Sequence, residues 1–118
     1  MKQLKIIDSY KLMETLADIQ DLSQKEQWNI YQLRKTLRPH FDFQVEREDA
    51  IRDKYRVFAD ADGNLEDEKA TEFVNELNEL NNMEIELKEF TRPKIRMVKG
   101  ISFLTAENLE DFIEFIPG

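Results

Sequence analysis

The side chains that most often carry catalytic or metal chemistry are scarce in this sequence. It contains no cysteine and one histidine, His40, which excludes thiolate metal sites, cysteine nucleophiles and histidine clusters within one chain. A histidine that acts as a base needs an orienting partner within hydrogen-bond reach. Asp42 is close in the sequence, but residues two apart on a helix face different directions. We therefore interpret His40 as a histidine at the surface or at a helix break.

One loop has the composition of a calcium site. Asp60, Asp62 and Asn64 fit positions 1, 3 and 5 of the twelve-residue EF-hand loop. Position 6 of that loop must be glycine and position 12 a bidentate glutamate, whereas this sequence has Leu65 and Thr71 there. We therefore interpret the loop as an ordinary helix-to-helix turn, and we predict no metal and no cofactor.

No sequence motif predicts an enzyme. The three glycines, Gly63, Gly100 and Gly118, do not form a glycine-rich phosphate loop, and there is no Gly-x-Ser-x-Gly motif. Two groups of acids share a predicted helix face: Glu72, Glu76 and Glu79, and Glu107, Glu110, Asp111 and Glu114. Such runs are usually solvated helix faces. We therefore predict no catalytic residue and no small-molecule substrate.

Aromatic and basic residues could instead recognise nucleic acid by stacking and phosphate contacts. Trp28 and Tyr31 have no glycine-rich motif or basic patch around them in the sequence, so we expect them in the core or in a helix–helix interface. A second group consists of four bases with no acid between them: Arg92, Lys94, Arg96 and Lys99. We interpret these bases as a solvated strand face, and a contact with nucleic acid or an acidic partner is the alternative.

Charge is distributed unevenly along the chain. The 118 residues carry 17 Lys and Arg against 25 Asp and Glu, a net charge of −8. Residues 1–59 hold 11 bases and 10 acids and residues 60–118 hold 6 and 15, so the halves carry +1 and −9. An acidic half disfavours general binding to a phosphate backbone, so we do not expect nucleic acid as the partner.

The sequence has no apolar run of the kind found in signal peptides or membrane spans. Near the amino terminus the longest such run is Ile6-Ile7, against roughly 7–15 residues for a signal peptide and roughly 20 for a span. We therefore expect a soluble, cytoplasmic protein that makes no membrane contact.

The first predicted helix runs from about residue 10 to residue 22. Asp8 and Ser9 are candidate N-caps, and the apolar residues that follow recur at the three-to-four spacing of one helix face. This apolar face comprises Tyr10, Leu12, Met13, Leu16, Ile19 and Leu22.

A second helical stretch is predicted over residues 24–58. Ser23 and Glu26 form the Ser-x-x-Glu pattern of a capping box. Pro39 lacks an N–H donor and disfavours a helical conformation at Arg38, so we expect a kink or a short break near residue 38. An unbroken helix would be roughly 50 Å long, and it would have to pack against another long helix of the same chain or of a second chain.

A turn and a third helix complete a predicted hairpin. Residues 60–64 are rich in Asp, Asn and Gly, which tolerate turn conformations. The helix that follows covers residues 66–81, and its apolar seam should pair antiparallel with residues 45–58. The seam comprises Ala70, Phe73, Leu77 and Leu80.

Two short strands and a last helix are predicted after this hairpin. Residues 83–87 and 94–97 alternate apolar and charged side chains, with acids on the first and bases on the second, so we expect them to pair. Thr105 caps a predicted helix over residues 106–115. The predicted fold is one α+β domain over residues 1–118, predominantly α. It consists of an antiparallel helical hairpin or bundle, a small two-stranded sheet and a short C-terminal helix.

The order of these features has a counterpart in a known family. The features are the first helix with Tyr10 and Leu16, the Asp-Gly-Asn turn at 62–64, the Glu72-Phe73 helix ending in Leu80, the strands at 83–87 and 94–97, and the closing Leu104-Thr105-Ala106-Glu107-Asn108-Leu109. This layout resembles a family of small proteins encoded by phages and prophages of Gram-positive bacteria. The family has no assigned activity, so the resemblance implies a phage origin and no functional site.

We therefore predict a non-enzymatic phage or prophage accessory protein that acts by binding another protein or a second copy of itself. The apolar stripes from Trp28 to Leu37 and from Phe73 to Leu80 need partners, which motivates this prediction. One alternative is an acidic DNA mimic that inhibits a host nucleic-acid enzyme. The other is nucleic-acid binding through the basic strand over residues 92–99.

Overall fold

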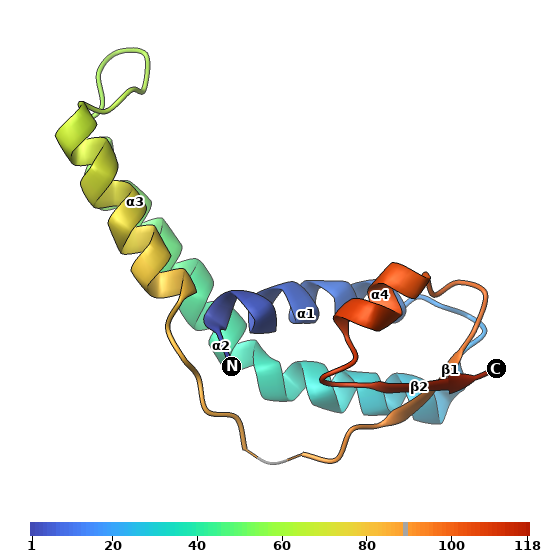
Figure 1. Cartoon of the computed structure of the whole chain (residues 1–118). Helices are drawn as coiled ribbons and strands as arrows, with labels where there is room; N and C mark the ends of the chain where they lie inside the picture. The colour runs from blue at the N-terminus through green and yellow to red at the C-terminus, as the bar shows by residue number, and fades with distance from the viewer. Residues whose placement is uncertain (89) are drawn as a thin grey trace.

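A computed structural model describes residues 1–88 and 90–118. Over these residues it contains helices α1 (Gln3–Leu16), α2 (Gln24–Arg56), α3 (Asp67–Asn81) and α4 (Phe103–Asn108), and strands β1 (Lys94–Met97) and β2 (Glu114–Pro117) (Figure 1). The predicted fold class is confirmed, because the chain is predominantly helical and carries a small two-stranded sheet.

Helix α1 begins and ends earlier than the sequence patterns predicted, since it stops at Leu16 and leaves Ile19 and Leu22 in the turn that follows. The predicted caps lie inside it, and Ser9 is buried rather than exposed at a helix end. The amino terminus pairs with the segment after α3, since Gln3 N–H donates to the Met83 carbonyl at 3.0 Å and Ile85 N–H to the Met1 carbonyl at 2.8 Å. This pairing fixes the chain before residue 3 and lets the helix start there.

Helix α2 begins at the predicted capping box and continues through Pro39 without a break. Ser23 Oγ accepts from Glu26 N–H at 3.1 Å, and Glu26 Oε1 accepts from Ser23 N–H at 2.9 Å. The helix bends between its cyan and green halves in Figure 1, where the missing proline donor weakens the helical hydrogen bonds. The predicted kink is therefore present, and the alternative of a short break in the helix is wrong.

The second half of α2, α3 and the loop between them project from the rest of the molecule, and we call this hairpin the arm (Figure 1). The predicted antiparallel pairing is confirmed by a small separate core. That core consists of Leu65, Phe73, Leu77 and Leu80 with Ile51 and Tyr55. The arm makes the molecule elongated, with a radius of gyration of 18.0 Å and extents of 53 × 30 × 19 Å.

The loop at the end of the arm is a tight turn built on Asp60. Its Oδ1 accepts from the backbone N–H groups of Asp62 and Asn64, both at 2.9 Å. Gly63 has a φ of 81°, a left-handed conformation that glycine adopts without steric cost. The predicted turn is confirmed.

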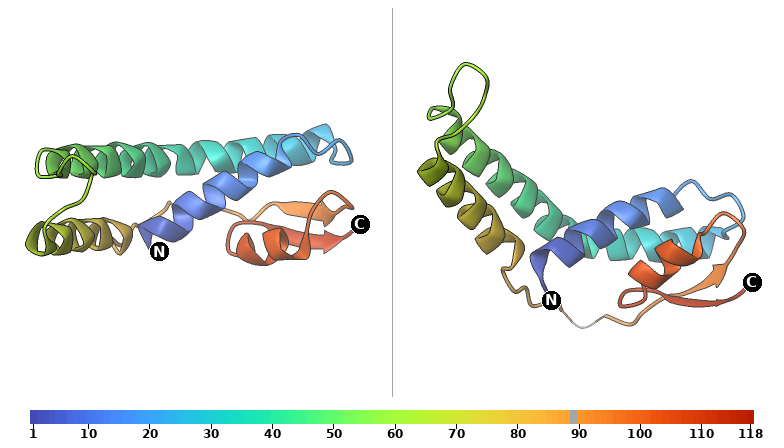
Figure 2. Two further views of the ribbon diagram at one scale, coloured as in Figure 1. Left: turned by 90° about the horizontal axis from the view of Figure 1, so that it is seen from above. Right: turned by 45° about the horizontal axis from the view of Figure 1, so that its top comes forward.

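The remaining elements form the body of the molecule, at the opposite end from the arm (Figure 2). Strands β1 and β2 pair in parallel, with Lys94 opposite Glu114 and Met97 opposite Pro117, and α4 lies in the connection between them. The main core joins α1, the first half of α2, β1 and the segment before β2. Its fully buried residues include Ile6, Met13, Leu16, Ile30, Leu37, Ile95, Leu109, Phe112 and Ile113.

Two predictions about the second half of the chain are wrong. Strand 94–97 does not pair with residues 83–87, where only an isolated antiparallel bridge joins Glu84 to Lys2. The predicted helix over residues 106–115 is replaced by the short helix α4, which starts at Phe103 with Ser102 as its N-cap. It ends at Asn108, before the apolar residues that the predicted helix included. A short apolar run fits a helix face or a strand equally well, and pairing with β1 makes residues 114–117 a strand.

Among the described residues no helix is long and apolar enough to cross a bilayer.

Candidate functional site

The outer face of α2 carries an exposed pair of aromatic side chains. Trp28 is 58% exposed and Tyr31 50% exposed, and their rings stack with centroids 5.7 Å apart and an interplanar angle of 26°. The buried side of this helix runs through Ile30, Leu33 and Leu37. At 3.6 residues per turn, Trp28 points about 200° away from Ile30. The prediction that this pair packs in the core is therefore wrong, and its role in an interface stays a prediction.

Three basic side chains continue the same face toward Pro39. Tyr31, Arg34, Lys35 and Arg38 line a hollow of about 160 Å³ together with Tyr10 of α1. The guanidinium groups of Arg34 and Arg38 lie 5.5 and 5.9 Å from the centre of the Tyr10 ring, and Arg38 Nη1 donates to the Tyr10 hydroxyl at 3.1 Å. Cation–π contacts and this hydrogen bond fix the two arginines in place.

This face is locally basic although the protein is acidic. Residues 27–41 contain Arg34, Lys35 and Arg38 and no acid. Two acids lie at its edges: Glu14 is 3.7 Å from Arg34, and Asp42 is 2.9 Å from Arg38. Lys35 makes no ion pair within the described part of the chain.

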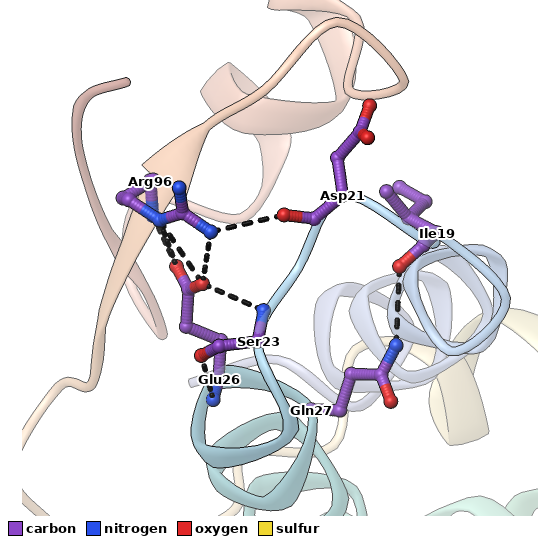
Figure 3. Close-up of polar contacts among 6 residues, drawn as sticks. All are labelled: Ile19, Asp21, Ser23, Glu26, Gln27 and Arg96. Atoms are coloured by element: carbon purple, nitrogen blue, oxygen red, sulfur yellow. Dashed lines mark hydrogen bonds and ion pairs between the residues drawn. The ribbon is translucent and has the colours of Figure 1, made fainter.

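The basic strand 92–99 uses its arginines in contacts within the chain. Arg96 donates from Nη2 to Glu26 Oε1 at 2.8 Å, from Nε to Glu26 Oε1 at 3.1 Å, and from its backbone N–H to Glu26 Oε2 at 2.8 Å (Figure 3). Its Nη2 also donates to the Asp21 carbonyl at 2.9 Å. Arg92 Nη2 donates to the Ile113 carbonyl at 3.3 Å. All four bases of this strand are exposed, so the arginines make these contacts at the surface.

The Glu26–Arg96 contact ties the start of α2 to β1. The Arg96 guanidinium holds the pKa of the Glu26 carboxyl at about 2, with help from the backbone N–H groups of Arg96 and Ser23 and against the effect of burial. Glu26 is 8% exposed, so its charge is stabilised by these donors rather than by water. We interpret this cluster as a structural clamp.

The end of the arm has the opposite character. Residues 57–68, which we call the arm tip, contain five acids and no base. All five are exposed: Asp60, Asp62, Glu66, Asp67 and Glu68. Val57 and Phe58, at the start of the arm tip, are 78% and 47% exposed. The arm tip is therefore acidic with an apolar side.

The other candidate residues from the sequence are not brought together. His40 is partly buried, and its carbonyl accepts from Gln3 Nε2 at 3.1 Å. The acids of α3 are partly paired within the arm, Glu76 with Lys54 at 2.8 Å and Glu72 with Lys69 at 3.1 Å. Among residues 1–88 and 90–118, no group of three histidines or acids could hold a metal ion.

Comparisons with other proteins assign no family. No family model, curated protein or solved structure matches the chain. The resemblance to phage proteins therefore stays a prediction, and the function has to be argued from the side chains described above.

Proposed function

We propose that the protein is a non-enzymatic accessory protein that binds another protein through the outer face of α2. We define the α2 face as Trp28, Tyr31, Arg34, Lys35 and Arg38. The stacked, half-exposed Trp28–Tyr31 pair beside three bases carries this proposal. Trp, Tyr and Arg are the residue types that contribute most binding energy at protein interfaces. On the predicted phage resemblance, the protein would act in the cytoplasm of the host cell.

The α2 face is rigid, which favours binding. Directly behind it, Ile30, Leu33 and Leu37 are at most 5% exposed and anchor the helix in the main core. The Tyr10 contacts already order the arginines on this face. Binding a partner would therefore order these two arginines at a smaller cost in side-chain entropy, which is one of the costs of association.

Nucleic-acid binding has less support from the same contacts. A protein that binds a phosphate backbone usually neutralises several phosphates with free cations. Here Arg96 and Arg92 make contacts within the chain, and acids flank Arg34 and Arg38. The net charge of −8 would also repel the polyanion. The DNA-mimic alternative has less support because Lys54 and Lys69 interrupt the acids of the arm.

Site-specific photocrosslinking in host cells tests the proposal. A photoreactive residue is placed at Tyr31, and the control carries it at Thr36, which is exposed on another side of α2. We expect a discrete crosslinked adduct from position 31 that position 36 does not give. Equal adduct patterns from the two positions, or none from either, would contradict the proposal.

A further inference from the structure

We infer that the α2 face binds the arm tip of a second copy of this chain. The inference rests on the proposed function, because it names the partner of the surface proposed there. It comes from two complementary surfaces that both belong to this protein and lie at different ends of it.

The two surfaces are complementary in charge. The α2 face lies in residues 27–41, which hold three bases and no acid. Glu14 and Asp42 pair with Arg34 and Arg38 at its edges, and Lys35 makes no ion pair within the described part of the chain. The arm tip, residues 57–68, holds five exposed acids and no base. Complementary charge steers association and disfavours wrong partners. The acids of the tip lie on a turn and at the start of α3, at the end of the arm. Lys69 directly follows the tip, where its Nζ lies 4.4 Å from the centre of the Phe58 ring and pairs with Glu72, and Lys54 pairs with Glu76 farther along the arm.

The two surfaces also each expose apolar area beside the charges. Trp28 and Tyr31 are 58% and 50% exposed on one, and Val57 and Phe58 are 78% and 47% exposed on the other. Burying these four side chains against one another would remove apolar surface from water, which the ion pairs alone would not do. Each surface therefore supplies both an apolar and a charged component.

The contact has to be between molecules. Tyr31 lies within α2 and Val57 directly follows its end, so one continuous helix holds them about 40 Å apart. Figure 2 shows that the bend in α2 does not fold the arm back onto the body. A tip therefore cannot reach the α2 face of its own chain. Two chains that exchange tips reciprocally would form a closed dimer, and one-way exchange would form a longer assembly.

A charge-swap experiment tests the inference. The face variant carries Lys35→Glu and Arg38→Glu, and the tip variant carries Asp62→Lys and Glu66→Lys. Asp60 is left unchanged because its Oδ1 accepts the two backbone bonds of the turn. The face variant leaves one base and two acids on the α2 face, and the tip variant lowers the charge of the arm tip from −5 to −1, so each variant loses most of the charge complementarity between the two surfaces. In an equimolar mixture, the unchanged face of the tip variant can again bind the unchanged tip of the face variant. The mass of each sample is measured by light scattering coupled to size exclusion near physiological salt, over a range of concentrations.

We expect the unmodified protein to have a mass of two or more chains, each variant to have a mass of one chain, and the mixture to regain the larger mass. Matched controls make the same charge changes elsewhere: Lys94→Glu with Lys99→Glu, and Glu46→Lys with Asp49→Lys, all at exposed positions. Both controls should keep the mass of the unmodified protein. Circular dichroism of every variant checks that it is folded.

A single-chain mass for the unmodified protein at all concentrations would overturn the inference. So would variants that keep the larger mass, or a mixture of folded variants that stays at one chain. The crosslinking at Tyr31 separates this failure from that of the proposed function. An adduct with a different protein would leave the proposed function standing without self-association, whereas no specific adduct and a single-chain mass would remove both.

Discussion

Replacing Glu26 by glutamine should destabilise the protein at neutral pH and have little effect in strong acid. Glu26 is 8% exposed and holds the start of α2 to Arg96 of β1. Glutamine has nearly the same size and can still accept a hydrogen bond from Ser23. The substitution therefore removes the negative charge of the clamp with little change in packing.

The size of the effect follows from the pKa of Glu26. Its folded value is about 2 against an ordinary value of 4.5, and this lowering by about 2.5 units corresponds to about 3 kcal/mol at 1.36 kcal/mol per unit. A carboxyl whose pKa is lowered by folding stabilises the protein fully above its unfolded pKa and loses that contribution as the pH falls through the folded value. The contribution of Glu26 is therefore complete above about pH 5 and decreases toward pH 2.

Urea unfolding followed by circular dichroism, at several pH values between 2 and 7, measures this difference. We expect the unmodified protein to exceed the Glu26→Gln variant by about 3 kcal/mol in free energy of unfolding at pH 7, and by much less near pH 2. The other carboxyls titrate in both proteins, so their contribution to the free energy of unfolding cancels when the two are compared at the same pH. A difference that stays constant over this range would refute the argument that the ionised clamp stabilises the fold.

Further substitutions test the remaining elements. Leu37→Ala empties part of the main core at a residue that is 0% exposed, so we expect it to lower the free energy of unfolding in urea by about 2–5 kcal/mol. Trp28→Ala on the exposed α2 face should lower the same free energy by less than about 1 kcal/mol. Gly63→Ala should cost about 1 kcal/mol, because the φ of 81° is strained for alanine although no atom lies within 4 Å of the added carbon. Pro39→Ala restores a helical donor, so we expect a higher melting temperature and a straighter α2, seen by small-angle scattering as a radius of gyration above 18.0 Å.

The parts of the fold that follow local rules could be predicted from the sequence. The capping box at Ser23 and Glu26 and the seam through Phe73, Leu77 and Leu80 depend on residues three or four apart. The partner of β1 could not be predicted in this way. Residues 83–87 alternate apolar and charged side chains, whereas Glu114–Pro117 is a short run without alternation. The choice between them depends on how the segment around Phe112 is buried against the main core.

The basic part of the α2 face was missed: Trp28 and Tyr31 were expected to have no basic patch around them, but Arg34, Lys35 and Arg38 lie beside Tyr31 on the same face. The absence of acids from residues 27–41 is visible in the sequence, but the chemistry of the neighbourhood is not, since Tyr10 comes from α1 and orders Arg34 and Arg38 only in the fold. Conversely, the bases over residues 92–99 are exposed as the sequence predicted, but the sequence did not show that Arg92 and Arg96 make contacts within the chain. Glu26, which pairs with Arg96, is 70 residues away from it in the chain.

The continuity of α2 links the fold to the proposed interactions. A break at Pro39, the alternative that the sequence left open, would have allowed the arm to fold back and its acidic tip to approach the basic face of the same chain. Because the helix bends without breaking, the two surfaces stay about 40 Å apart and neither can neutralise the other within one molecule. Trp28 and Tyr31 on the face and the five acids on the tip remain exposed, so a second molecule can reach both surfaces.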